Sequence, residues 1–85
     1  HPGQVAEIVK RFPEACKARL VVTGEMANDQ MALRVETANT ADEGLKARMA
    51  DAVRDVTKLR GDVQLVAVGS LPNDGKVIED ARSYQ

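Results

Sequence analysis

Residues 20–36 read LVVTGEMANDQMALRVE and predict the β-hairpin on which the fold is built. The first three of these residues form an apolar, largely β-branched run of the kind that strands prefer. From Met31 to Glu36, apolar side chains alternate with others, which is the period-2 pattern of a strand with one face in solvent. Residues 24–29 lie between the two runs and predict a turn, so the strands are close enough in sequence to pair with each other.

A helix is predicted on each side of this hairpin. The first covers residues 2–12, where apolar side chains recur at helical spacing until Pro13 ends the pattern. The second has Thr40 or Asp42 as its N-cap and Gly61 as the residue just past its C-terminus. Its apolar stripe consists of Leu45, Met49, Ala52, Val53, Val56 and Leu59.

Residues 63–68 predict a third strand, and because they are almost all apolar we expect this strand at the centre of the sheet. The order of elements is then α-β-β-α-β. This order predicts the fold class α+β, a small sandwich in which helices pack on a sheet of about three strands. The connection from the second strand through the long helix permits a right-handed crossover into the third strand.

The segment after that strand, residues 69–77, reads GSLPNDGKV, and we call it the lysine loop. Pro72 and Gly75 fix a polar turn, and the compact charge of Lys76 on its long side chain suits phosphate and carboxylate oxygens. An ordinary solvated turn has the same composition, so these residues alone leave both interpretations open. A phosphate-binding P-loop is excluded, because five residues separate Gly69 from Gly75 and Val77 replaces the hydroxyl residue that would bind magnesium.

The composition narrows the class of function. With 85 residues the chain is one domain, and its net charge of -1 argues against a general binder of nucleic acids. The only aromatic residues, Phe12 and Tyr84, do not make a stacking platform for single strands. No apolar run approaches the roughly 20 residues of a membrane span.

Cys16 has no second cysteine to pair with, which favours a reducing cytoplasm. His1 has no companion ligand, so no metal site is predicted.

Several segments resemble the C-terminal domain of the phenylacetate–coenzyme A ligase family. Residues 1–5, HPGQV, resemble that family's Phe-Pro-Ser-Gln-Val/Ile, and residues 19–23 with 29–36 resemble its hairpin. Residues 69–76, GSLPNDGK, resemble its Gly-Ser/Thr-Leu-Pro-Arg-Ser-Glu-Gly-Lys loop, one residue shorter. The chain departs from the family at Asn73-Asp74, which replaces an Arg-Ser pair. It departs again after Lys76, where Val-Ile-Glu-Asp replaces a basic Ala-Lys-Arg-Val segment.

The resemblance implies that residues 1–85 are the small, mobile C-terminal lid domain of a larger ligase, whose N-terminal AMP-binding domain is its partner. Such enzymes activate a carboxylic acid with ATP and Mg²⁺ to an acyl adenylate, and then form a thioester with coenzyme A. On this basis Lys76 is the expected catalytic residue for adenylation, and Gly75 and Lys76 are the expected cofactor-binding residues. The expected substrate is a small aryl or acyl carboxylic acid, and the isolated domain is expected to be inactive, with no cofactor bound.

A second hypothesis is a stand-alone ligand-sensing or dimerisation module with a ferredoxin-like α+β fold, in which Lys76 is an ordinary loop residue. The chain opens at His1 without a methionine and enters a helical pattern almost at once, which favours an excised domain. An ATP-binding domain encoded upstream of His1 would support the ligase hypothesis. The sequence leaves open which acid is activated and whether two copies form a homodimer.

Overall fold

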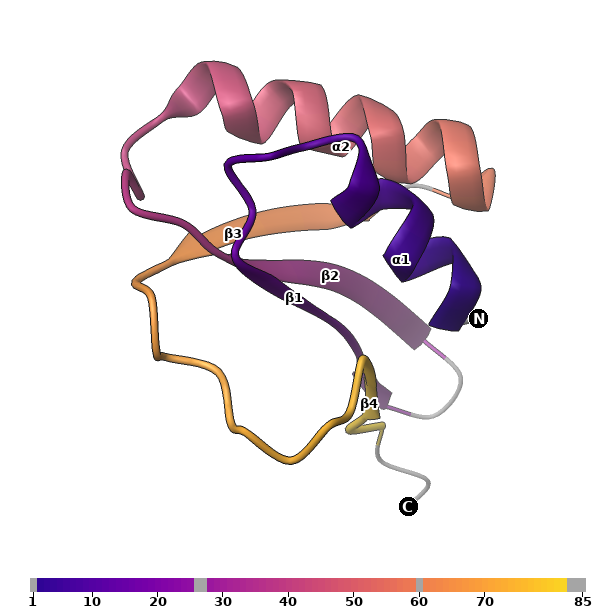
Figure 1. Cartoon of the computed structure of the whole chain (residues 1–85). Coiled ribbons are helices and arrows are strands. Elements are labelled where there is room, and N and C mark those ends of the chain that lie inside the picture. Colours follow the sequence, from indigo (N-terminus) through magenta and orange to yellow (C-terminus); the bar gives the residue numbers. More distant parts are fainter. Residues whose placement is uncertain (1, 26–27, 60, 83–85) are drawn as a thin grey trace.

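The computed structural model describes residues 2–25, 28–59 and 61–82. The elements within them are α1 (Pro2–Lys10), β1 (Lys17–Glu25), β2 (Asn28–Glu36), α2 (Glu43–Thr57), β3 (Asp62–Val66) and β4 (Ile78–Asp80). The predicted α+β class is confirmed, with both helices on one side of a single sheet (Figure 1). Among the described residues, no helix is long and apolar enough to cross a membrane.

The sheet is mixed, with its four strands in the order β3-β2-β1-β4. β1 and β2 form the predicted antiparallel hairpin, in which Leu20 lies opposite Leu33. The strands run further than predicted, to residue 25 and from residue 28, and residues 26–27 of the predicted turn lie outside the described part of the chain. Parallel pairs complete the sheet, β2 with β3 and β1 with β4.

Two features of the sheet correct the prediction from sequence. β3 is an edge strand and not the central one, because it is less apolar than it seemed: Asp62 and Gln64 are exposed, and only Val63 is fully buried. The sheet also has a fourth strand in place of the expected three. Residues Ile78–Asp80 are few and two of them are acidic, so they form a strand only through their pairing with Leu20–Val22.

The core lies between the helices and the sheet. Side chains alternate between the two faces of a strand, and the register places Leu20, Leu33 and Val63 on the same face. These three side chains are buried together with the apolar stripes of α1 and α2. The largest fully buried side chains are Ile8, Leu33, Val35, Leu45, Met49, Val53 and Val63. Neither α1 nor α2, the helices of the described residues, lies on the other face of the sheet (Figure 1).

Capping residues set both ends of α2. Asp42 is the N-cap, as one of the two predictions had it, and its carboxylate accepts a hydrogen bond from the Leu45 N–H at 3.0 Å. The C-cap is Lys58, which has a left-handed backbone with φ 61° and donates its N–H to the Arg54 carbonyl. Gly61 was therefore wrongly predicted to end the helix, since the chain has already left it at Lys58.

Candidate functional site

The lysine loop connects the two edge strands of the sheet. Because β3 and β4 lie at opposite edges, the chain between them must cross the full width of the sheet. Figure 1 shows this segment on the side of the sheet away from the helices. The crossing brings the loop past Glu36, the last residue of β2, and past Lys17 and Arg19 near the start of β1.

Glu36 anchors the beginning of the loop. The residue is only 4% exposed. Its Oε1 accepts the Gly69 N–H at 2.8 Å, and its Oε2 accepts the Leu71 N–H at 2.9 Å. These two backbone bonds, that of Gly69 first, lower the pKa of the Glu36 carboxyl, and they outweigh its burial, which acts in the opposite direction. Glu36 therefore satisfies, as a carboxylate, two loop N–H groups that would otherwise need another partner.

Arg19 anchors the middle and the end of the loop. Its side chain is only 3% exposed. Nη2 donates to the Pro72 carbonyl at 3.2 Å and also to the Asp74 carboxylate, while Nη1 donates to Glu79 Oε1 at 3.0 Å. The same Pro72 carbonyl accepts a hydrogen bond from Lys17 Nζ at 2.8 Å. The planar guanidinium can engage several acceptors at once, so one side chain joins three separate points of the segment 72–79.

Lys76 lies on the exposed part of this anchored loop. Its backbone N–H donates to Asp74 Oδ1 at 3.0 Å, and this bond is the first cause of the lowered pKa of the Asp74 carboxyl, to which Arg19 also contributes. Gly75, between these two residues, has φ +76°, a conformation that glycine adopts without steric cost. The Lys76 side chain is exposed, and within the described residues its ammonium group makes no hydrogen bond or ion pair.

This arrangement fixes the backbone beside Lys76 and leaves its side chain able to reach a partner. An ammonium group held in this way can stabilise negative charge on a phosphate or carboxylate oxygen. The two predicted site residues, Gly75 and Lys76, thus lie together at the exposed part of the loop. The acidic segment that follows Lys76 has structural partners: Glu79 pairs with Arg19, and Asp80 pairs with Arg82.

Sequence reasoning missed Glu36 and Arg19 as part of this site. Both lie on strands, at positions where alternation places them on the face away from the helices, and that face is predicted to be solvated. They are buried only because the lysine loop crosses that face. The hydrogen-bonded partners are 33 to 60 residues apart in the sequence, so no local sequence pattern predicts these hydrogen bonds.

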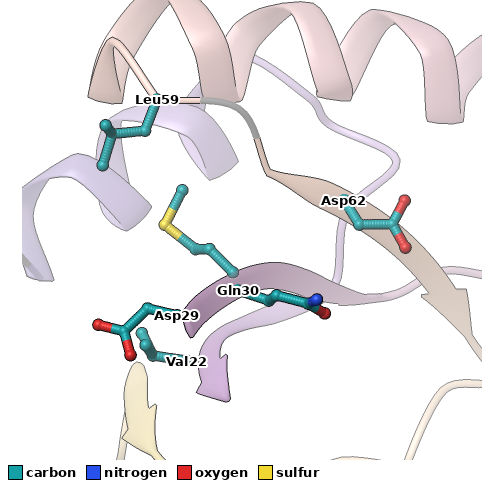
Figure 2. Close-up of a pocket in the computed structure, with 6 residues that line it drawn as sticks. Val22, Asp29, Gln30, Leu59 and Asp62 are labelled. Atoms are coloured by element: carbon teal, nitrogen blue, oxygen red, sulfur yellow. The ribbon is translucent and has the colours of Figure 1, made fainter. Parts of the chain in front are cut away.

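A pocket of about 620 Å³ lies at the opposite end of the β1–β2 hairpin from these anchors. Figure 2 shows the side chains that line it. Its described lining residues are Val22, Asp29, Gln30, Met31, Leu59 and Asp62. None of them belongs to the lysine loop, and nothing in the sequence predicted the pocket. Residues 2–25, 28–59 and 61–82 contain no group of three or more His, Cys, Asp or Glu side chains placed to hold a metal ion.

The model of the family described as AMP-binding enzyme C-terminal domain matches residues 1–82, so the chain belongs to that family. Among curated proteins, none matches this chain closely enough to count as a relative.

Parts of CoA ligases are among the solved structures that have the same fold. A domain of phenylacetate-coenzyme A ligase from Bacteroides vulgatus ATCC 8482 superimposes with a TM-score of 0.80 at 25% identity, over 96% of this chain and 84% of that one. A 2-hydroxyisobutyryl-CoA ligase in complex with 2-HIB-AMP and CoA, in the thioesterification state, gives a TM-score of 0.78 at 23% identity. An open conformation of the same ligase gives 0.74 at 21% identity, over 92% of this chain. This chain covers only 20% and 19% of those two ligase chains.

Proposed function

We propose that this chain is the C-terminal lid domain of an AMP-forming carboxylic acid–CoA ligase, and that Lys76 serves the adenylation step. The observation that carries the proposal is the exposed Lys76 ammonium group on a loop whose backbone is fixed from several sides. Membership of the AMP-binding enzyme C-terminal domain family supports it, as does the similarity to a domain of phenylacetate-coenzyme A ligase.

The proposal assigns most of the chemistry to a larger N-terminal domain. This chain corresponds to about a fifth of the 2-hydroxyisobutyryl-CoA ligase, which leaves room for a large domain that binds ATP, Mg²⁺ and a small aryl or acyl acid. The described residues offer no metal-binding cluster of their own, so Mg²⁺ would be held in that domain or by the nucleotide. On this view the isolated chain is inactive, and the complete protein works in the cytoplasm.

In the first step a carboxylate oxygen of the acid attacks the α-phosphorus of ATP, and pyrophosphate leaves. The Lys76 ammonium group would stabilise the negative charge on the acid and on the α-phosphate as they approach. Closure of the domain over the site would bring Lys76 to the reacting atoms and exclude water. In the second step the domain swivels, the sulfur of coenzyme A attacks the acyl carbon, and AMP leaves as the thioester forms.

The departure from the family after Lys76 fits this assignment. Glu79 and Asp80 form part of β4 and have basic partners in Arg19 and Arg82, so they contribute to holding the segment in place. We therefore assign the adenylation role to Lys76 alone and give no phosphate-binding role to the segment that follows it.

The test compares Lys76→Ala with the wild type in the full-length protein. Acid-dependent ATP–pyrophosphate exchange reports the first step, and thioester formation from preformed acyl adenylate reports the second. We expect exchange to fall by about 10²- to 10³-fold, as for other losses of one charge-stabilising group, while the second step keeps its rate. The matched control is Lys10→Ala, an exposed lysine on α1, which we expect to leave both steps unchanged. Equal rates of exchange in wild type and Lys76→Ala would refute the proposal.

A further inference from the structure

The buried charges under the lysine loop require an explanation. Glu36 and Arg19 are almost completely buried, and burying a charged group is costly unless it is fully paired. The hydrogen bonds of both side chains go to the lysine loop and to its continuation into β4. Two apolar side chains at these positions would fill the same space without this cost. The presence of Glu36 and Arg19 is therefore better explained by their hydrogen bonds to the lysine loop than by packing.

We propose that Glu36 and Arg19 are positioning residues, which fix the lysine loop so that Lys76 meets the reacting carboxylate and α-phosphate. The proposal rests on the function proposed above for Lys76. Neither residue touches substrate in this assignment, and both act through the backbone of the loop.

The two anchors bracket Lys76 from different sides. Glu36 fixes the loop at Gly69 and Leu71, where both oxygens of one carboxylate accept backbone N–H groups. The start of the loop is further closed by the Ser70 N–H, which donates to the Ala67 carbonyl at 3.0 Å. Gly69 itself has φ +90°, so the backbone takes here a conformation open to glycine. The chain therefore enters the loop in one defined direction.

Arg19 fixes the part of the loop that carries Lys76. Its contacts to Pro72 and Asp74 lie before Lys76, and its contact to Glu79 lies after it. Asp74 passes this constraint on, because it also accepts the N–H of Lys76. A lysine at position 19 would keep the charge but lack the planar fork that reaches several acceptors in one plane.

The expected consequence is a loss of reaction rate without a loss of the fold. A misplacement of about 1 Å in a catalytic group can cost about 10²-fold in rate. In Glu36→Gln the side chain keeps its shape, but an amide NH₂ replaces one carboxylate oxygen and faces an N–H donor. We therefore expect Glu36→Gln and Arg19→Lys to slow pyrophosphate exchange by about 10- to 100-fold in the full-length protein, with thioester formation from preformed adenylate unchanged.

The control is Glu43→Gln, an exposed glutamate in the first turn of α2, which we expect to leave exchange unchanged. A double variant then separates positioning from other roles. If Glu36 acts through Lys76, Glu36→Gln combined with Lys76→Ala is no slower than Lys76→Ala alone, because the effects of coupled residues do not add. Hydrogen exchange on the same proteins should show faster exchange of the Gly69 and Leu71 amides in Glu36→Gln, with the β1–β2 hairpin still protected.

Each outcome decides the matter. If pyrophosphate exchange is slow in Lys76→Ala but unchanged in Glu36→Gln and Arg19→Lys, the positioning proposal is overturned and the proposed function stands. Multiplied losses in the double variant also overturn it, since Glu36 would then act independently of Lys76. If Glu36→Gln slows pyrophosphate exchange and thioester formation equally, and the β1–β2 hairpin loses its protection from hydrogen exchange, Glu36 only supports the fold and the positioning proposal is overturned for it. The same two measurements on Arg19→Lys decide the matter for Arg19. Unchanged exchange in Lys76→Ala overturns both proposals together.

Discussion

Leu71 provides the apolar anchor of the lysine loop, and its removal is the sharpest stability test of the structure. The residue is 4% exposed although it lies outside the main cluster of buried side chains, whereas Leu59, beyond the end of α2, is 60% exposed. The same substitution, leucine to alanine, can therefore be made at a buried and at an exposed position of one chain.

The magnitude follows from the apolar groups that are lost. Leu71→Ala removes the equivalent of three buried carbon groups, and at about 0.8 kcal/mol for each the transfer term is about 2.4 kcal/mol. A residual cavity adds to this, within the range of about 2–5 kcal/mol observed for such changes. Because a loop can partly collapse into the space, we expect about 2–3 kcal/mol for Leu71→Ala. For Leu59→Ala we expect a change within about 0.5 kcal/mol.

Thermal unfolding of the 85-residue chain measures both values. For a domain of this size, a loss of 1 kcal/mol lowers the Tm by roughly 4–8 °C, so Leu71→Ala should lower it by about 10–20 °C. Leu59→Ala should stay within a few degrees of the wild type. Equal effects of the two substitutions would refute the reasoning, because they would mean that Leu71 is not packed against the domain and that the loop is not held as described.

Two further predictions concern the backbone and the charge of the loop. Gly75 has φ +76° and open space where a Cβ would stand, so Gly75→Ala should cost about 1–2 kcal/mol in urea unfolding from the backbone alone, and Gly75→Asn should cost less. An equal cost for both would point to a steric cause instead. Because the folded state lowers the pKa of the Glu36 carboxyl, its contribution to stability is present at neutral pH and is lost as the pH falls below about 4.3 and through the lowered value. Glu36→Gln should therefore lose less stability on acidification than the wild type, and parallel curves of unfolding free energy against pH would contradict this.

The elements that the sequence predicted well are those whose patterns are local. The apolar stripe of α2 has the helical period, and Asp42 lies directly before it, so the helix and its N-cap could both be predicted. The hairpin could be predicted from the alternation in residues 31–36. The position of β3 was wrong because the run 63–68 was treated as almost wholly apolar, whereas Asp62 and Gln64 are exposed in the structure. β4 was missed because three residues carry too little pattern of their own.

The sequence by itself determined the class of the fold, the family resemblance and the candidate lysine, because each of these depends on residue types within a few positions of one another. Only the tertiary structure decided that the lysine loop must cross the sheet, since this follows from β3 and β4 lying at opposite edges. That crossing buries Glu36 and Arg19 and joins them to residues 33 to 60 positions away. The contacts that Glu36 and Arg19 make with the lysine loop therefore depend on the order of the strands, and this order is set by the packing of the whole chain.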